Sequence, residues 1–477
     1  MKLFLRGLVL SSLLLSVAWS GDYVPGRVLV KPAEGANEAN VQGSIRAAGA
    51  REVGRIHQIN VRILQVPEKA EASVVAALSK NPNFEFAELD YIATANLTPN
   101  DPLYASYQWH LPSISAPAAW DTATGSSNTI VAIVDTGVQA NHPDLLGRCL
   151  QGYDFVNNDA NPDDDEGHGT GTSGAAAASG NDGIGMAGVT WGSKILPVKV
   201  LGADGSGAFS TIASGINYSA DQGARVINMS LGGTFSSSTL QNAVNYAWNK
   251  GATLIAAAGN SGTSQAQYPA ACSNVVAVSA LDRSNRITSW SSYGSFVDLC
   301  APGLDIGTLG FNGTYVVASG TSFSSPIVAG VACLALSVNP ALNNSQLVAL
   351  LTRNADDLGT AGFDSYYGNG KVNASRVVAA ALTADLVSPV TSVTNPTNGA
   401  SIAGLKSVLV TVVSSDDRAV TKAELYINGR LTASSASGNF SYTWSTSSLK
   451  TGTYTLQSKA YDAGGNTASS AVVSVRR

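Results

Sequence analysis

Charged residues are scarce in this chain of 477 amino acids. Only 13% of the residues are Asp, Glu, Lys or Arg, and 28 basic residues stand against 33 acidic ones, giving a formal net charge of -5. Without a basic excess, the chain lacks the electrostatic signature of a protein that binds nucleic acid or anionic membranes. Solubility must therefore come from uncharged polar side chains.

Histidine and cysteine are also rare, with four of each. Their spacing does not suggest a zinc site. Cys149, Cys272, Cys300 and Cys333 allow three complete pairings in an oxidising compartment, and the sequence does not choose among them. Cys333 falls on the expected buried face of an apolar helix, where a free thiol is as plausible as a disulfide.

Long apolar runs are missing except at the N-terminus. Lys2 and Arg6 mark a basic start, residues 8–17 form a short apolar core, and Ala18-Trp19-Ser20 carries small residues at the two positions that a signal peptidase reads. We therefore expect a signal peptide over residues 1–20, with cleavage before Gly21, and a secreted protein. No other apolar run approaches 18 residues, so we expect no membrane span.

Three short segments carry one chemistry: Asp135 in I-V-D-T-G, His168 in G-H-G-T and Ser322 in S-G-T-S-F-S-S-P. Asp135 ends an apolar run from Ile130 that is typical of a buried parallel strand, and Ser322 falls in the first turn of an apolar helix through about Leu336. Each residue alone has a simpler explanation as a helix cap or loop residue. In the order Asp, His, Ser, they form a triad signature.

Together with further blocks, these motifs resemble the secreted bacterial subtilisin-like serine peptidases, and among them the thermitase-like branch. The resemblance covers roughly residues 97–382 and includes N-H-P-D-L (141–145), I-N-M-S-L-G-G (227–233), V-N-Y-A-W-N-K-G (244–251) and A-A-A-G-N (256–260). It implies an α/β fold, a doubly wound parallel sheet with helices on both faces. The implied activity is hydrolysis of peptide bonds in protein substrates by a monomeric enzyme.

The resemblance also implies roles for individual residues. Ser322 would be the nucleophile, His168 the general base and Asp135 the residue that orients the imidazole. The side-chain amide of Asn260 and the backbone N–H of Ser322 would stabilise the oxyanion. The substrate side chain before the scissile bond would enter an uncharged slot formed by Ser230, Leu231, Gly232, Ala257, Ala258, Gly259 and Gln267.

The chain departs from the family pattern beside two of these residues. After Thr170, relatives usually carry His or Arg, but Gly171 stands here. After the nucleophile they usually carry Met and Ala, but Phe323 and Ser324 stand here. We expect the larger Phe323 to narrow the leaving-group side of the site.

Acidic residues suggest a structural calcium ion, which prefers hard oxygen ligands. By resemblance, the first site combines carboxylates and backbone carbonyls of Asp101, Asp144, Ser179, Asp182, Ile184 and Met186. A second candidate is the loop that carries Asp154, Asp159, Asn161 and Asp163, for which a simple solvated acidic loop is an equal alternative.

Segments before and after the peptidase-like region complete the expected domain organisation. Residues 21–96 resemble a small α+β inhibitor-type propeptide whose tail, residues 86–95, would occupy the cleft of the peptidase domain (97–383) and be cut near Asn96. Residues 388–477 alternate apolar and polar positions around an Asn428-Gly429 hairpin turn and resemble a bacterial immunoglobulin-like β-sandwich. A plain accessory domain is the alternative for the first segment.

The sequence thus predicts a secreted, calcium-stabilised serine endopeptidase made as a self-processing zymogen, with its own propeptide as intramolecular inhibitor. The rival hypothesis is a non-catalytic secreted binding protein built on an inactive peptidase scaffold.

Overall fold

The computed structural model describes residues 23–92 and 97–477. By its internal packing the chain divides into two units, residues 1–95 and 96–477. The predicted signal peptide and the predicted cleavage point near Asn96 lie outside the described residues.

The first unit is a four-stranded antiparallel sheet in the order β2-β3-β1-β4. Side chains alternate between the two faces of the sheet, and Val28, Val30 and Leu64 lie on the face that packs into the core. These elements agree with the expected α+β fold, and the charged residues and glycine of β2 hide its alternation in the sequence. The elements are β1 (Tyr23–Pro32), α1 (Glu38–Ala47), β2 (Arg51–Ile56), η1 (His57–Ile59), β3 (Val61–Gln65), α2 (Glu71–Leu78) and β4 (Phe84–Tyr91).

Part of the predicted tail of this unit lies in its sheet. Residues 86–91 belong to β4, an edge strand hydrogen-bonded to β1. Residues 93–95 of the predicted tail lie outside the described residues.

A seven-stranded sheet in which all neighbouring strands run parallel organises residues 97–383. The strand order is β11-β10-β9-β8-β5-β7-β6, so the direction of winding reverses around β5. The strands are β5 (Ile130–Asp135), β6 (Tyr153–Asp154), β7 (Lys194–Lys199), β8 (Val226–Met229), β9 (Thr253–Ala257), β10 (Val275–Leu281) and β11 (Leu299–Pro302), and a separate hairpin joins β12 (Ile306–Leu309) to β13 (Tyr315–Ala318).

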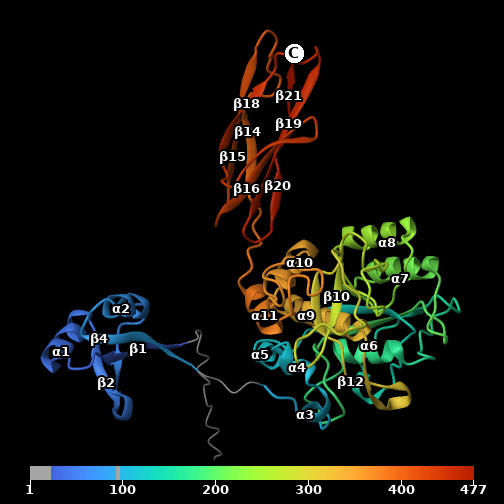
Figure 1. The fold of residues 1–477 in the computed structure, drawn as a ribbon, viewed down its shortest axis with the longest axis horizontal. Helices are drawn as coiled ribbons and strands as arrows, with labels where there is room; N and C mark the ends of the chain where they lie inside the picture. The colour runs from blue at the N-terminus through green and yellow to red at the C-terminus, as the bar shows by residue number, and fades with distance from the viewer. Residues whose placement is uncertain (1–22, 93–96) are drawn as a thin grey trace, which may run out of the picture. The chain divides into compact units, whose positions relative to one another are not determined.

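Helices cover both faces of this sheet, as predicted (Figure 1). Helices α7 and α8 pack on one face, and α6 and α9 pack on the other. The helices are α3 (Tyr104–Tyr107), α4 (His110–Ser113), α5 (Ala116–Trp120), η2 (Pro143–Leu145), α6 (His168–Ala177), α7 (Phe209–Asp221), α8 (Ser238–Asn249), η3 (Phe311–Gly313), α9 (Thr321–Val338), α10 (Asn344–Arg353) and α11 (Ala374–Leu382).

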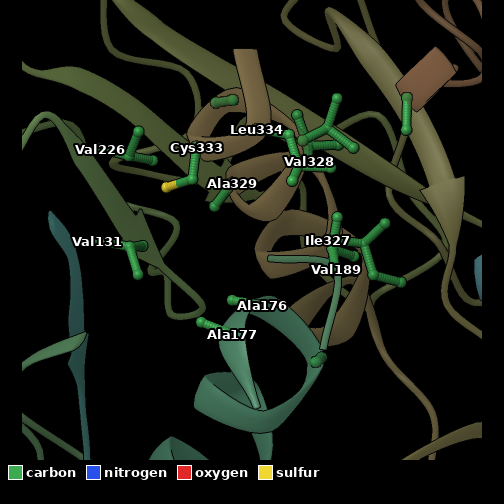
Figure 2. Close-up of a cluster of buried hydrophobic side chains, with 14 of the residues drawn as sticks. Val131, Ala176, Ala177, Val189, Val226, Ile327, Val328, Ala329, Cys333 and Leu334 are labelled. Carbon is green, nitrogen blue, oxygen red and sulfur yellow. The ribbon is translucent and has the colours of Figure 1, made fainter. Parts of the chain in front are cut away.

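Helix α9 is the central core helix. Figure 2 shows its Ile327, Val328 and Cys333 among apolar residues of α6 and the sheet. Among the described residues it is the one helix long and apolar enough to span a membrane, but 89% of it is buried inside the protein. The position of this helix in the core explains its apolar composition.

All four cysteines are free thiols. Cys333 is fully buried in α9, and Cys272 and Cys300 are buried in other parts of the core. None of the three pairings that the sequence allows is formed, and the free core thiol expected as one option for Cys333 is present.

Residues 390–476 form two antiparallel sheets packed around Trp444, which is 7% exposed. Asn428 and Gly429, both with positive φ, make the predicted turn between β16 and β17. The strands are β14 (Val390–Asn395), β15 (Ser407–Ser415), β16 (Val420–Ile427), β17 (Arg430–Ser435), β18 (Phe440–Ser445), β19 (Thr453–Asp462), β20 (Thr467–Ser469) and β21 (Val473–Arg476).

Candidate active site

Asp135 is the last residue of β5 and is fully buried. Its position at the carboxyl end of the strand, where the winding of the sheet reverses, is where α/β folds commonly carry their sites. One carboxylate oxygen, Oδ1, accepts a hydrogen bond from the Thr136 amide (2.8 Å) and lies 2.7 Å from His168 Nδ1. The other, Oδ2, accepts from the Thr172 hydroxyl (3.3 Å). The carboxylate is thereby fixed in one orientation toward the imidazole.

His168 begins helix α6, and close backbone approach brings it to Asp135. A β-carbon on the next residue, Gly169, would lie 2.0 Å from the Gly137 carbonyl oxygen, so only glycine lets the helix start against the end of β5. Burial of the His168 ring opposes its protonation, but the Asp135 carboxylate outweighs burial. With further contributions from Glu166 and Asp164, the pKa of His168 is raised to about 9.

The acidic tract before His168 supports the start of α6. Asp164 is 4% exposed and its carboxylate accepts hydrogen bonds from the hydroxyls of Thr136 (2.8 Å) and Thr170 (2.6 Å), besides three backbone amides. Burial would raise the pKa of Asp164, but these bonds outweigh burial and lower it. Thr136 in turn accepts from the Gly169 amide (2.9 Å). Sequence reasoning missed Asp164 and Thr136, since an acidic run normally indicates a solvated surface.

Ser322 is the second residue of α9. Its hydroxyl donates to the Ser230 carbonyl at 3.3 Å, and no hydrogen bond to His168 is found among the described residues. Ser230 contacts the same turn, because its own hydroxyl donates to the Ser322 carbonyl at 2.7 Å. The start of α9 is therefore tied to the segment after β8.

Asn260 lies in the loop after β9. Its side-chain oxygen accepts from the amide (2.9 Å) and the hydroxyl (2.8 Å) of Thr321, which leaves Nδ2 directed elsewhere. A β-carbon on Gly320 would lie 3.5 Å from Asn260 Nδ2 and 3.6 Å from the Ser322 nitrogen. These two donors therefore border the same small space beside Gly320.

A cavity of about 230 Å³ opens next to Ser322 and Asn260. Gln267 is 9% exposed and reaches between Gly232 and Gly259. Of the predicted slot residues, Ala258 is fully buried and does not line the cavity. The lining, which contains no charged side chain, is Ser230, Leu231, Gly232, Ala257, Gly259, Asn260, Gln267, Thr321 and Ser322.

The two departures from the family pattern meet in space. Phe323 is 7% exposed, and its ring lies edge-on to the His168 ring with 5.9 Å between centroids. A β-carbon on Gly171 would lie 3.4 Å from Phe323 Cε1 and 3.2 Å from the Leu309 carbonyl oxygen. The missing side chain at Gly171 leaves the room that Phe323 fills.

The carboxylates of the first predicted metal site lie near one another. Burial raises the pKa of Asp101, and the charges of Asp182 and Asp144 add to this shift. Asp101 is 4% exposed, and its Oδ1 has no hydrogen-bond partner. Asp144 accepts from the Met186 amide (2.8 Å) and from the hydroxyl of Tyr315 (3.1 Å), a neighbour that sequence reasoning missed. The orphaned oxygen and the grouped carboxylates fit a hard cation.

The rest of the predicted ligand set belongs to the same loop. Asp182 accepts a hydrogen bond from the Ile184 amide (2.9 Å), and the Ser179 amide donates to the Asp144 carbonyl (2.8 Å). The loop from Ser179 to Met186 is therefore held against Asp144 at both ends.

The second predicted metal loop is stabilised by its own hydrogen bonds. Asp154 is buried, and both of its carboxylate oxygens accept from the backbone or side chain of residues 156–157. Asp159 accepts from the Asn161 amide at 2.8 Å, and Asp163 is exposed. These contacts give the carboxylates of Asp154 and Asp159 a structural role without an ion.

Comparison with known proteins agrees with this geometry. Residues 126–370 match the subtilase family, residues 14–90 the fervidolysin N-terminal prodomain, and residues 389–457 a bacterial Ig domain. The chain is 41% identical over 358 residues to the thermophilic serine proteinase of Bacillus sp. (strain AK1), covering 75% of this chain and 88% of the relative. It is 48% identical over 281 residues to thermitase of Thermoactinomyces vulgaris, covering 59% of this chain and 99% of thermitase.

A solved protease structure from Pseudoalteromonas arctica PAMC 21717 matches with a TM-score of 0.56 and 33% identity, over 60% of this chain and 100% of that chain. The family match covers about half of the sequence, and the relatives are matched over nearly their full length. The chain therefore belongs to the subtilase family and is a serine endopeptidase made with an N-terminal prodomain.

Proposed function

We propose that Ser322, His168 and Asp135 are the catalytic triad of this endopeptidase. The observation that carries the assignment is the 2.7 Å contact between Asp135 Oδ1 and His168 Nδ1, next to a cavity lined by Ser322. Asp135 holds the imidazole in the tautomer whose Nε2 accepts a proton, and it stabilises the imidazolium that follows.

The reaction begins when Ser322 turns its hydroxyl from the Ser230 carbonyl toward His168. Oγ attacks the scissile carbonyl carbon while Nε2 takes the hydroxyl proton. His168 then protonates the leaving amine, and the acyl group stays on Ser322 until water, deprotonated by the same imidazole, releases it. The general base must be neutral at the start, so activity depends on the ionisation of His168.

Asn260 Nδ2 and the Ser322 N–H stabilise the tetrahedral oxyanion. The bonds from Thr321 to the Asn260 side-chain oxygen fix the amide, which supports this role because a preorganised donor costs no reorientation during the reaction. Thr321 is thus a positioning residue.

The cavity beside Ser322 receives the side chain before the scissile bond. Its uncharged lining disfavours a lysine or arginine, because burying an unpaired cation costs several kcal/mol. Burial of Phe, Tyr, Leu or Met there contributes about 1.5 to 3 kcal/mol.

The enzyme is a monomer that is exported behind a signal peptide, residues 1–20, and inhibited by its own propeptide, residues 21–96, until it cuts itself near Asn96. The peptidase domain then spans 97–383 and the sandwich 388–477. We expect no nucleic-acid partner and no membrane span. Supporting this proposal are the N-terminal sequence, the prodomain match and the low net charge.

A calcium ion stabilises the peptidase domain through Asp101, Asp144, Asp182 and the loop from Ser179 to Met186. The ion would neutralise buried carboxylates that otherwise repel one another. A millimolar chelator should lower the melting temperature of Ser322→Ala, and added Ca²⁺ should restore it. An unchanged melting temperature would refute the site, and Asp154→Asn is the control that should leave the response intact.

A casein zymogram of wild type beside Ser322→Ala tests the triad. Wild type should clear casein and shed residues up to about 96, whereas Ser322→Ala should remain an intact, inactive precursor. Equal clearing by both proteins would reject Ser322 as the nucleophile. Absence of clearing by correctly folded wild type would favour the binding-protein alternative.

A further inference from the structure

Three carboxylates meet where the chain enters the C-terminal sandwich. Asp385 belongs to the segment after α11, Asp416 to the turn between β15 and β16, and Asp462 is the last residue of β19. One ligand oxygen from each lies within 4.8 Å of the other two. Within the part of the chain that the structure describes, no other group of three His, Cys, Asp or Glu side chains is gathered this closely.

Two of these carboxylates keep an oxygen without a hydrogen-bond partner. Asp385 is only 7% exposed and its Oδ2 is unpartnered, while its Oδ1 accepts from the Val387 amide at 3.0 Å. In Asp416, Oδ1 is unpartnered, and Oδ2 accepts from the amides of Arg418 (3.1 Å) and Ala419 (3.0 Å). One oxygen of each carboxylate is thus oriented by the backbone, and the other accepts no hydrogen bond.

The third carboxylate is oriented in a similar way. Asp462 is 4% exposed and accepts from the Asn466 amide (2.7 Å) and side chain (2.6 Å). The same Asn466 side chain donates to the carbonyl oxygens of Asp385 (2.9 Å) and Val387 (3.0 Å). These hydrogen bonds hold the connecting segment around Asp385 against the end of β19 without an ion.

One cation of the protein lies beside the cluster. Arg418 Nε is 3.6 Å from Asp385 Oδ2, but the side chain is 58% exposed and makes no hydrogen bond to that oxygen. Its guanidinium donates instead to the Thr383 carbonyl at 3.2 Å. One partly solvated guanidinium against three carboxylates leaves an excess of negative charge, which is unfavourable at buried positions.

We propose that Asp385, Asp416 and Asp462 bind a calcium ion. Ca²⁺ binds oxygen at about 2.4 Å, so ligands on opposite sides of the ion lie up to about 4.8 Å apart, and one oxygen of each carboxylate falls within that limit. Mg²⁺ requires about 2.1 Å and near-ideal octahedral geometry, and the set contains no His or Cys to favour zinc. This ion is independent of the one proposed for the peptidase domain.

Binding joins three segments that are distant in sequence. It neutralises the buried charge and pins the segment around Asp385 to the turn at Asp416 and the end of β19. The expected consequence is a connecting segment that is more ordered in calcium than in its absence, and therefore less accessible to proteases.

Calcium stoichiometry measures the site directly. In full-length Ser322→Ala, which avoids autolysis, equilibrium dialysis with ⁴⁵Ca²⁺ should show one ion fewer after Asp416→Asn. This substitution keeps the shape of the side chain, and the amide oxygen can still accept from Arg418 and Ala419. Asp417→Asn is the matched control, because Asp417 is the exposed neighbour outside the cluster. Equal stoichiometry in all three proteins would overturn the proposal.

Hydrogen exchange first tests the site with all three aspartates intact. Calcium should slow exchange in peptides covering residues 383–390, 414–420 and 460–468 of Ser322→Ala. The protection should be lost in Asp416→Asn and kept in Asp144→Asn, so that failure of the peptidase-domain site and failure of this one are distinguishable. If calcium leaves these three peptides unchanged in Ser322→Ala itself, Arg418 alone balances the carboxylates and the proposal is wrong.

Discussion

Replacing Gly171 by histidine, a residue common at this position in relatives, should overfill the space between α6 and α9. The new β-carbon alone would lie 3.2 Å from the Leu309 carbonyl oxygen and 3.4 Å from the ring of Phe323. The imidazole beyond it would need the volume that Phe323 occupies. Overpacking of this kind costs about 1 to 3 kcal/mol. In a domain of this size, each kcal/mol corresponds to a fall of about 2 to 4 °C in melting temperature.

A second substitution should relieve this strain. Methionine at position 323 is unbranched and adapts to irregular space, so Gly171→His/Phe323→Met should be more stable than the sum of the single changes predicts. Phe323→Met alone leaves a poorly filled site next to Gly171 and should itself be destabilising. We expect a coupling free energy of about 0.5 to 3 kcal/mol, as found for side chains in contact.

The assay is thermal unfolding at one scan rate in the Ser322→Ala background with calcium present, which excludes autolysis. Gly171→Ala is the control, since it adds only the β-carbon and should cost much less than histidine. If the melting-temperature changes of the two single variants simply add in the double variant, Gly171 and Phe323 do not share a space and the reasoning is wrong.

Three other outcomes concern catalysis. Because the pKa of His168 is raised to about 9, kcat/KM should rise with pH as the imidazole loses its proton and level off above that value. Glu166 contributes to this raised pKa, so Glu166→Gln should move the rise to lower pH. The control Asp163→Asn should move it less. Asn260→Ala should lower kcat by about 10² to 10³ with little change in KM, which is the loss known for removal of one such donor in subtilisin. Thr321→Val should lower kcat less, because the backbone amide of residue 321 still donates to the Asn260 side-chain oxygen. In a set of chromogenic tetrapeptides that differ only at the residue before the scissile bond, Phe and Leu should give higher kcat/KM than Lys and Arg, and the reverse order would contradict the uncharged pocket.

The parts of the site that the sequence predicts are those with a local signature. An apolar run ending in Asp135 predicts a buried strand with a carboxylate at its end, and Ser322 before an apolar segment predicts a residue in the first turn of a helix. Both elements are present with nearly the predicted bounds. These inferences succeed because burial leaves a periodic pattern in the sequence.

The remaining features depend on contacts between distant segments. Asp164 looks like part of a solvated acidic tract, yet folding turns it inward against Thr136 and Thr170. The vicinity of Gly171 and Phe323 is equally invisible, since each residue alone is only a departure from a pattern. Asp385, Asp416 and Asp462 lie in three separate segments, and no spacing rule connects them.

The parallel sheet also has a kinetic consequence. Antiparallel neighbours can be joined by a tight turn, but each parallel pair in this sheet requires a crossover, so the native pairings form between residues far apart along the chain. Such topologies fold slowly, because the entropy of closing long loops is lost before the contacts form. His168 and Ser322 stand on opposite sides of most of these crossovers. A partly folded chain therefore has no assembled nucleophile and base, and it cannot cut its neighbours until the sheet is complete.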